Sequence, residues 1–196
     1  MNALILIDIQ NDFLPGGSLE VPKGDEIIDN INSIMDNYSM VVATKDWHPK
    51  NHISFASNHN NKKAGQIITI NNLDQILWPD HCIKDSKGSE FSEKLDSHKI
   101  HKIFYKGVDS NIDSYSGFYD NGKIRSTGLS NFLKKNNINQ VDIVGLATDY
   151  CVKYSSIDAY NEGFKTNVLR CCVRGISVET TETVFKEMKD IGISII

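Results

Sequence analysis

The chain has 196 residues, of which 40% are hydrophobic and 23% are charged. This composition is typical of a globular protein and excludes disordered and fibrous chains, and the length favours a single domain over residues 1–196. The 21 basic and 25 acidic residues give a net charge of −4 without a cluster of Lys or Arg, which argues against nucleic acid as a partner.

Strand-like and helix-like segments alternate along the chain. The run at 3–7 is continuously apolar, as expected for a strand buried on both faces. In chain order we expect a strand at 3–7, a helix at 27–35, strands at 40–44, 67–70 and 103–105, a helix capped by Thr127, a strand at 141–146, a helix at 149–161, a strand at 166–169, a helix at 180–190 and a strand at 193–196. This alternation predicts a three-layer α/β/α fold with a mostly parallel, six-stranded sheet.

A polar segment interrupts the alternation between His48 and Gly65. It is rich in Asn and Lys and poor in apolar residues, so we expect a long surface loop. Loops of this length inside a domain usually have a function or are mobile.

Reactive side chains come just after the predicted strands. They are Asp8, Asp46, His48, Lys106 and Cys151. Because ligands of open parallel sheets bind at the carboxyl ends of the strands, we expect these side chains to share one edge of the sheet. Taken singly, each has an ordinary interpretation as a turn aspartate, a solvated lysine or a small core cysteine. Together they predict a reactive site, in which the positive end of a helix favours the Cys151 thiolate.

Two of these residues could bind a cation. Asp46 and His48 lie two residues apart, so both can reach one metal ion from an extended segment. His81 is distant in the sequence and could supply a third ligand. The alternative is that these polar side chains only decorate surface loops.

The N-terminal apolar run and the cysteines indicate the compartment. The run ends at Asp8, which is too short for a signal peptide or a membrane span. The four cysteines, at 82, 151, 171 and 172, have no CxxC spacing, and an unstrained disulfide between neighbours is hardly feasible. We therefore expect reduced thiols, a cytoplasmic protein and no membrane partner.

Seven short motifs carry a family resemblance. They are LIDIQNDF at 6–13, TKDWHP at 44–49, HISFA at 52–56, WPDHC at 78–82, YKG at 105–107, DSYSGF at 113–118 and GLATDYCV at 145–152. In this order they make nearly the whole chain resemble the nicotinamidases, also called pyrazinamidases, among the isochorismatase-like cysteine hydrolases. The Asp, Lys and Cys set marks the wider superfamily, whereas the DWHP and WPxHC pair is specific to nicotinamidases.

The resemblance implies a catalytic triad of Asp8, Lys106 and Cys151. Cys151 would attack the amide carbonyl as a thiolate, Asp8 would carry the thiol proton to the leaving nitrogen, and Lys106 would lower the thiol pKa. The backbone N–H groups of Ala147 and Cys151 would form the oxyanion hole. The family also has a cis peptide bond before the nucleophile turn, which here falls between Leu146 and Ala147.

The resemblance also implies one divalent metal ion, bound by Asp46, His48 and His81, that would hold the pyridine nitrogen of the substrate. Zinc is our first choice for this ion, with iron or manganese as alternatives. His52 is a further candidate, either as a fourth ligand or as a residue behind the first three.

Three aromatic residues in the family motifs, Phe13, Trp78 and Tyr115, could hold the pyridine ring, although Phe13 and Trp78 could also be ordinary core anchors. The chain departs from the family at Cys171, near a position where relatives commonly carry Asp. This change could alter the support of the site or a subunit contact. Family members range from monomers upward, which leaves a homo-oligomer open.

The implied reaction is the hydrolysis of nicotinamide to nicotinate and ammonia through a thioester on Cys151. It would feed NAD salvage, and pyrazinamide would be a second substrate. One alternative is a ureido or carbamoyl amidase of the same superfamily, which would generally lack the Asp/His/His group. Another is a binding protein without activity, which would have no reason to keep Asp8, Lys106 and Cys151. An isochorismatase is disfavoured because vinyl-ether hydrolysis needs no nucleophilic cysteine.

Overall fold

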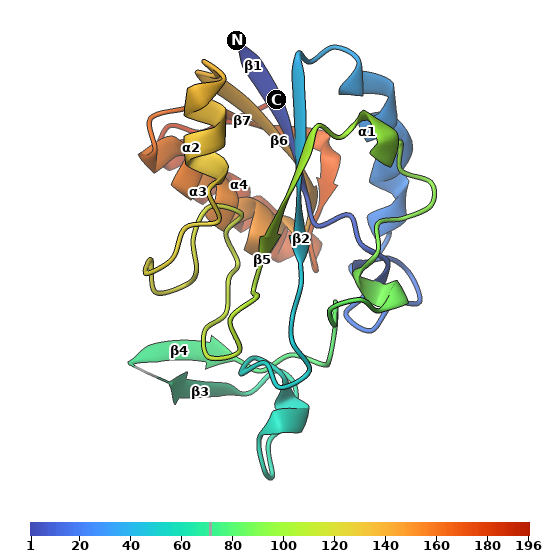
Figure 1. The fold of residues 1–196 in the computed structure, drawn as a ribbon, viewed down its shortest axis with the longest axis vertical. Coiled ribbons are helices and arrows are strands. Elements are labelled where there is room, and N and C mark those ends of the chain that lie inside the picture. Colours follow the sequence, from blue (N-terminus) through green and yellow to red (C-terminus); the bar gives the residue numbers. More distant parts are fainter. Residues whose placement is uncertain (71) are drawn as a thin grey trace.

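The computed structural model describes residues 1–70 and 72–196 and has a parallel sheet at its centre (Figure 1). In sheet order the six strands are β5 (Lys102–Lys106), β2 (Met40–Asp46), β1 (Asn2–Ile7), β6 (Gln140–Leu146), β7 (Lys165–Arg174) and β8 (Ser194–Ile195). Each pair of neighbouring strands is parallel. The predicted six-stranded sheet is therefore confirmed, and it is parallel throughout.

Alternate side chains of β1 contribute to the cores on the two faces of the sheet. Ala3, Ile5 and Ile7 belong to one apolar cluster, and Leu4 and Leu6 belong to the other. All five side chains are fully buried. A strand buried on both faces has an unbroken apolar sequence, which is why 3–7 lacks the alternation of a half-exposed strand.

Helices cover both faces of the sheet and complete the three predicted layers. α1 (Ile28–Met35) packs into the cluster of Leu4, whereas α2 (Leu129–Lys135), α3 (Lys153–Asn161) and α4 (Val178–Asp190) pack into the other cluster. Figure 1 shows α1 on one side of the sheet and these three helices on the opposite side. The longest of them has 13 residues, and none of the described helices is both long and apolar enough to cross a membrane.

Several strands extend beyond their predicted ends. β2 and β5 continue to Asp46 and Lys106, so these reactive residues are the last residues of strands and not part of the loops that follow. β7 continues to Arg174 through an irregularity in its pairing with β6. The polar Arg170 breaks the apolar run in this strand, which is why the sequence pattern ended too early.

Two helices begin at residues other than the predicted ones. Gly128, with a φ of 89°, caps α2, and the predicted cap Thr127 instead accepts a hydrogen bond at Oγ1 from the Leu129 N–H (3.2 Å). The helix expected to begin at Asp149 begins as a π-helical turn, Thr148–Val152, which continues as α3. Such π turns are frequent at functional sites.

The segment expected to be a long surface loop is exposed mainly in its second half, and in its first half Lys50 and Asn51 are exposed while most other residues are buried or half-buried. His48, His52 and Phe55 have at most 1% of their surface exposed, and Phe55 forms a bridge with Trp78. The prediction was wrong here because a polar composition does not distinguish solvated histidines from histidines that are buried in a site.

A two-stranded hairpin follows this loop. Its first strand, β3 (Ile67–Ile70), has the predicted limits. Its partner, β4 (Leu73–Ile76), pairs with it in the antiparallel direction and was not predicted, because its sequence LDQI has no clear strand pattern.

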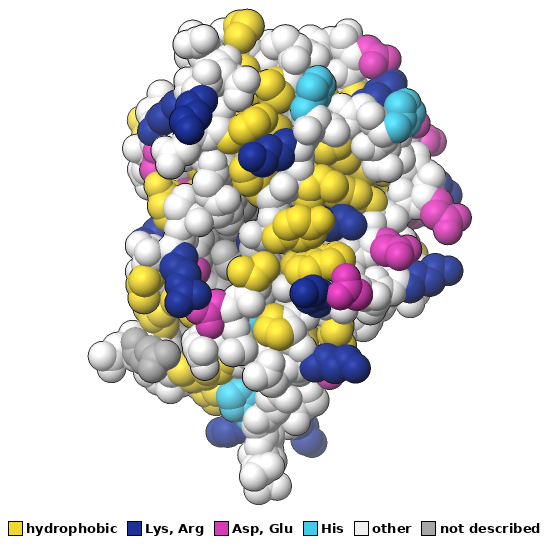
Figure 2. Space-filling view, in the orientation of Figure 1, with side chains coloured by type: hydrophobic (Ala, Val, Ile, Leu, Met, Phe, Trp, Pro, Cys, Tyr) yellow, Lys and Arg dark blue, Asp and Glu magenta, His cyan; other side chains and the backbone are white. Residues whose placement is uncertain are grey.

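β5 is an edge strand, and apolar side chains gather over it. Figure 2 shows hydrophobic side chains in the middle of this face, in the region of β5 and β2. Tyr105 is 45% exposed and its ring centre lies 5.1 Å from that of Trp47, while Nζ of Lys45 lies 4.2 Å from the ring centre of Phe91. Bulky and charged side chains of this kind protect an edge strand from pairing with other chains. A homo-oligomer stays a prediction.

The order of the strands determines where the site forms. The chain passes from β1 to β2 and β5 on one side, and then returns to β6, β7 and β8 on the other side. In such sheets the crevice for ligands lies at the carboxyl ends of the strands, where the order reverses. Asp8 directly follows β1 and Cys151 follows β6, so both residues reach this crevice.

Ile5 tests the assignment of the core. Ile5→Ala should lower the free energy of unfolding by about 2–5 kcal/mol, because it removes buried methyl and methylene groups and leaves a cavity. Ile124→Ala, at a side chain that is 77% exposed, should change this free energy by less than about 0.5 kcal/mol. Urea unfolding followed by circular dichroism measures both. Equal losses in the two variants would contradict the assignment.

Candidate active site

Lys106 lies at the centre of a buried cluster at the carboxyl edge of the sheet. Its Nζ lies 2.9 Å from Oδ2 of Asp8, 2.5 Å from Oδ1 of Asp46 and 3.4 Å from Sγ of Cys151. Asp8 and Lys106 are almost completely buried, and Asp46 and Cys151 are 4% and 7% exposed. The structure thus brings together residues from the ends of β1, β2 and β5 and from the turn after β6.

The backbone and a threonine fix the position of Asp8. Its φ of 49° lies in the left-handed region, which turns the chain out of β1 directly after Ile7. Oγ1 of Thr44 donates a hydrogen bond to Oδ1 of Asp8 (2.6 Å). This leaves Oδ2 of Asp8 to face the Lys106 ammonium. The sequence analysis gave Thr44 no role, since a threonine inside a strand is unremarkable.

Cys151 lies in the π-helical turn Thr148–Val152 and not at the first residue of an α-helix. The peptide bond between Leu146 and Ala147, which leads into this turn, is cis, as the family resemblance implied. The thiol sulfur, one oxygen of Asp8 and one oxygen of Asp46 lie within 4.8 Å of one another. The thiol therefore has carboxylates as well as the ammonium within reach.

The surroundings keep the Cys151 thiol protonated. Burial raises the pKa of this thiol, the Lys106 ammonium only partly offsets the effect, and the Asp8 carboxylate raises the pKa further. Lys106 lowers the thiol pKa, as the resemblance implied, but burial and the Asp8 carboxylate outweigh it in this arrangement. A thiol of this kind needs a base before it can act as a nucleophile.

Asp8 and Lys106 have pKa shifts that suit a base and a fixed cation. Burial raises the pKa of Asp8, although Lys106 opposes the effect, so this carboxylate binds a proton more readily than an exposed one. Burial disfavours the charged form of Lys106, but Asp46 and Asp8 outweigh it and raise the pKa of the lysine. Lys106 therefore stays positively charged.

A second group of polar side chains shares Asp46 with this cluster. Nε2 of His48 lies 3.7 Å from Oδ1 of Asp46, and Nε2 of His81 lies 3.9 Å from Oδ2. The three residues offer one ligand atom each within 4.8 Å of one another, and all three are buried. Two nitrogens and one oxygen at such distances could surround one divalent ion.

Backbone carbonyl groups determine which nitrogen of each histidine faces this group. Nδ1 of His48 lies 2.8 Å from the carbonyl oxygen of Gly107, and Nδ1 of His81 lies 2.8 Å from that of Pro79. A carbonyl oxygen only accepts, so each Nδ1 carries a hydrogen, and in the neutral form of each ring Nε2 has a free lone pair. This is the tautomer that a metal ligand needs, and it supports the fit of an ion here.

The pKa shifts of the two histidines differ, and only the shift of His81 favours the neutral ring that binds a metal ion. Burial, and then the neighbouring His48, lower the pKa of His81 to about 4, so His81 is neutral. Burial also disfavours a charge on His48, but the Asp46 carboxylate outweighs it and raises the pKa of His48. Asp46 therefore attracts positive charge to the place where a metal ion would bind.

His52 lies beside this group. Its Nδ1 lies 2.7 Å from Oγ of Ser54, and its Nε2 is buried with no hydrogen-bond partner among the described residues. The residues within ligand distance of it are His48 and Asp113, and not the pair of Asp46 and His81. The geometry therefore separates His52 from the three predicted ligands.

Gln10 was missed by the sequence analysis, although it lies in the first motif. Its Oε1 accepts a hydrogen bond from the Asp46 N–H (2.8 Å), and its Nε2 donates to the Asp46 carbonyl oxygen (2.8 Å). The two hydrogen bonds of this buried side chain take the place of those that a neighbouring strand would make at the end of β2. They fix the backbone of Asp46. Residues 36 positions apart in the sequence make this contact, so no local pattern could reveal it.

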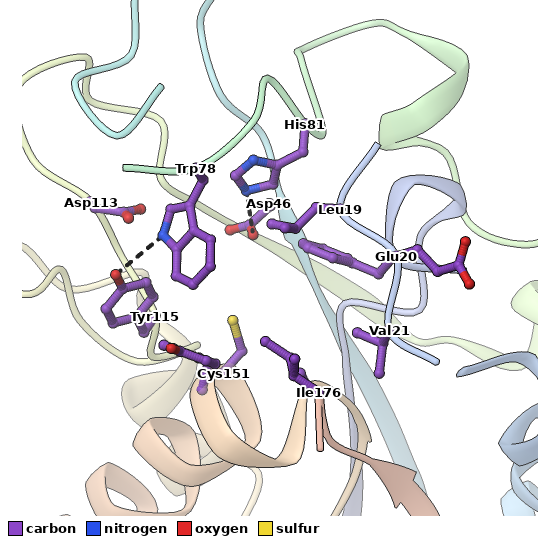
Figure 3. A pocket seen from close by; sticks show the side chains of 13 residues that line it. Leu19, Glu20, Val21, Asp46, Trp78, His81, Asp113, Tyr115, Cys151 and Ile176 are labelled. Carbon is purple, nitrogen blue, oxygen red and sulfur yellow. Dashed lines mark hydrogen bonds and ion pairs between the residues drawn. The ribbon is translucent and has the colours of Figure 1, made fainter. Parts of the chain in front are cut away.

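A pocket of about 200 Å³ opens over these groups. Phe13, Trp78 and Tyr115 line it, as predicted, and Nε1 of Trp78 donates a hydrogen bond to the Tyr115 hydroxyl (3.3 Å). Figure 3 shows Cys151 at one end of the pocket and Asp46 and His81 at the other. Further lining residues that the sequence analysis missed are Leu19, Glu20, Val21, Asp113, Tyr150 and Ile176.

Cys171 does not line this pocket. It is exposed on β7, and its Sγ lies 3.5 Å from that of Cys172. All four cysteines are free thiols, as predicted. The departure from the family pattern thus leaves the Lys106 cluster unchanged.

A cysteine, an aspartate and a lysine at the switch point of a parallel α/β sheet define a cysteine hydrolase of the α/β class. The chain belongs to the isochorismatase family, because the Isochorismatase domain matches residues 2–196.

Known proteins that are similar over most of their length refine this class. The nicotinamidase of Escherichia coli (strain K12) is 40% identical over 97% of this chain and 92% of its own length. A nicotinamidase and pyrazinamidase structure from Acinetobacter baumanii has a TM-score of 0.96 at 40% identity and covers 100% of this chain and 95% of its own. The pyrazinamidase of Pyrococcus horikoshii, solved in complex with zinc, has a TM-score of 0.82 at 36% identity and covers 100% and 98%. The resemblance to nicotinamidases is confirmed.

Gly107 tests the support of His48. Gly107 has a φ of 62°, and a Cβ atom there would lie 2.2 Å from Cε1 of His48. Gly107→Ala should therefore displace the imidazole and lower the affinity for a divalent ion by about 10–100-fold. This is the usual effect when a metal-binding histidine loses the group that holds its ring in place.

Gly65→Ala is the matched control, because Gly65 also has a positive φ (86°) but has no atoms within 4 Å of the added Cβ. Titration with Zn²⁺, followed by calorimetry, measures the affinity of both variants. Equal affinities would show that the contact of Gly107 with His48 does not matter for the ion.

Proposed function

We propose that this chain is a metal-containing cysteine amidohydrolase that converts nicotinamide to nicotinate and ammonia. We expect it to hydrolyse pyrazinamide in the same way. The observation that carries the proposal is one small pocket with a nucleophile cluster at one end and a group of metal-ligand type at the other. A pyridine ring with a carboxamide in the meta position likewise carries two polar groups at separate positions of one small flat ring.

The first step attaches the acyl group to Cys151. Asp8 accepts the thiol proton while Sγ forms a bond to the amide carbonyl carbon, and the carbonyl π electrons move to the oxygen. Asp8 then gives this proton to the amide nitrogen, the carbon–nitrogen bond breaks, and ammonia leaves. The raised pKa of Asp8 supports this role, because the carboxyl must both take and return a proton.

The second step releases the acid. A water molecule gives a proton to Asp8 while its oxygen attacks the thioester carbonyl carbon. The carbon–sulfur bond breaks, the sulfur takes the proton back from Asp8, and the product leaves as nicotinic acid, which gives its remaining proton to the solvent and becomes nicotinate. Lys106 stays charged throughout and holds Asp8 in place at 2.9 Å. The backbone N–H groups of Ala147 and Cys151 are our proposed donors to the oxyanion in both steps.

Asp46, His48 and His81 would hold the divalent ion, with zinc as our first choice and iron or manganese as alternatives. The two free Nε2 lone pairs and the shared carboxylate support this set. When bound, the ion would supply a Lewis acid that holds the pyridine nitrogen. We assign His52 to the surroundings of this set, since it forms a group with His48 and Asp113 and not with Asp46 and His81.

Phe13, Trp78 and Tyr115 are the proposed binding residues for the ring. They line the pocket between its two polar ends, and their apolar surfaces suit a flat heteroaromatic molecule. The hydrogen bond from Trp78 to Tyr115 fixes both rings relative to each other.

The reaction would return nicotinate to NAD synthesis, which places the protein in NAD salvage. A ureido or carbamoyl amidase is the weaker alternative, because such an enzyme has no use for the group of Asp46, His48 and His81. A binding protein without activity is also weaker, because a binding protein gains nothing from a buried ammonium that contacts two carboxylates and a thiol.

Replacement of the nucleophile tests the reaction. Cys151→Ala should lower kcat for ammonia release from nicotinamide by at least about 10⁴-fold, because the thioester cannot form. Cys171→Ala, which removes an exposed thiol outside the pocket, should keep the wild-type rate. Ammonia release by a Cys151→Ala protein of correct fold would rule out this nucleophile, and no release by the wild-type protein with Zn²⁺, Fe²⁺ or Mn²⁺ would rule out the function.

Removal of the metal tests the second end of the pocket. Treatment with a chelator should lower kcat/KM for nicotinamide by about 100-fold or more. Loss of a single residue that supports a metal ligand already lowers metal affinity or activity by about 10–100-fold, and loss of the ion should cost at least as much. The ion that restores the rate identifies the natural metal. His81→Ala should reproduce the loss, since His81 contacts Asp46 but not Lys106. Full activity in protein shown to be free of metal would contradict the role of the ion.

A further inference from the structure

Ile176 lines both the active-site pocket and a second cavity. The second cavity has a volume of about 400 Å³ and lies between the segment after Val21 and the start of α4. Ile176 lines both cavities and is the residue that the two share within the described part of the chain. Its side chain is 41% exposed. Ile176 is thus the point at which a change of side chain can affect both spaces.

The second cavity differs in character from the first. Its apolar side chains are Pro22, Val173, Val178 and Phe185, and its polar rim has two ion pairs. Arg174 pairs with Glu26 at 3.1 Å, and Arg170 pairs with Glu182. Both arginines are therefore already neutralised, and the cavity could take an uncharged extension of an aromatic molecule.

A carboxylate from the nucleophile turn holds Ile176 in place. Both oxygens of Asp149 lie 3.1 Å from the Ile176 backbone nitrogen and accept its hydrogen, and Oδ2 also accepts a hydrogen bond from Oγ1 of Thr180 (2.6 Å). Asp149 lies two residues before Cys151 in the same π-helical turn. The position of Ile176 is thus tied to that of the nucleophile.

The loop that carries Ile176 has little freedom to move away. A Cβ atom on Gly175 would lie 2.0 Å from Oγ1 of Thr181, so the backbone passes directly against α4. Ser177 caps this helix by accepting a hydrogen bond from the Thr180 N–H (3.1 Å). The residues on both sides of Ile176 are therefore fixed to α4.

We propose that Ile176 is a specificity-determining residue that limits the acyl group of the substrate to a single ring, and that Asp149 is the positioning residue for it. This inference rests on the proposed amidohydrolase function. A pocket of about 200 Å³ is smaller than the cavities of about 300–1,000 Å³ that hold drug-sized ligands, so a second fused ring needs additional space. Figure 3 shows Ile176 beside Cys151, on the side away from Tyr115. We therefore expect the edge of a bound ring to meet Ile176.

The ratio of kcat/KM for nicotinamide to that for quinoline-3-carboxamide measures the effect. The wild-type protein should strongly prefer nicotinamide. Ile176→Ala should shift this ratio toward the bicyclic amide by at least about tenfold, because small changes in the size of an apolar pocket commonly change substrate discrimination by this amount. Val178→Ala is the matched control, because Val178 lines only the second cavity and is 82% exposed. An unchanged ratio in Ile176→Ala would overturn the proposal.

Two variants test the positioning role of Asp149. Asp149→Ala should shift the same ratio in the same direction and raise KM for nicotinamide more than it lowers kcat. Asp149→Asn keeps one acceptor oxygen and should restore part of the wild-type ratio. A loss of kcat with an unchanged ratio would show that Asp149 supports only the nucleophile turn.

A second readout does not depend on turnover. Alkylation of Cys151 by N-phenylmaleimide should accelerate relative to alkylation by iodoacetamide in Ile176→Ala, and not in Val178→Ala, with the Cys151 peptide followed by mass spectrometry. If the wild-type protein does not hydrolyse nicotinamide, the proposed function fails while this labelling ratio still decides whether Ile176 limits the space beside Cys151. Equal labelling ratios in the wild type and in Ile176→Ala would overturn the inference alone.

Discussion

The buried ammonium of Lys106 is the interaction on which the site depends. An isolated charge inside a protein is costly unless charges and hydrogen bonds compensate it. Here the carboxylates of Asp8 and Asp46 lie 2.9 Å and 2.5 Å from Nζ. Without the lysine, the two carboxylates would repel each other, and with it the end of β5 has to meet the ends of β1 and β2. The same charge explains why a nucleophile can exist there, because the thiol 3.4 Å away has both a cation and a base beside it.

Asp46 joins the two halves of the pocket. Its Oδ1 faces Lys106, and its carboxylate also faces Nε2 of His48 and of His81. Burial opposes ionisation of Asp46, but Lys106 and then His48 outweigh it and keep the pKa of this carboxyl low. One permanently ionised group therefore supports both the nucleophile cluster and the group that would hold the metal. A change at Asp46 affects both ends of the pocket at once, whereas a change at His81 does not.

The sequence predicted the reactive residues well but not their environment. Residues at the ends of strands were found because buried parallel strands have continuous apolar sequences that end visibly at Asp8, Asp46 and Lys106. The thiol was different. The position of Cys151 after a strand suggested a helix terminus and a low pKa, but the turn is a π-helix and burial raises the pKa. Burial depends on packing from distant elements, which local spacing does not reveal.

The sequence by itself determined the order of the elements, the apolar faces of β1 and the residues that reach the carboxyl edge of the sheet. These follow from periodicity and from strand ends, which depend on neighbours in the chain. Only the tertiary structure decided the hairpin of β3 and β4, the clamp of Gln10 on Asp46 and the place of Ile176 in the pocket of Cys151. The contact of Gln10 spans 36 residues and that of Asp149 with Ile176 spans 27. Such contacts arise when separate elements meet around a shared cavity, and no short-range pattern in the sequence encodes where they meet.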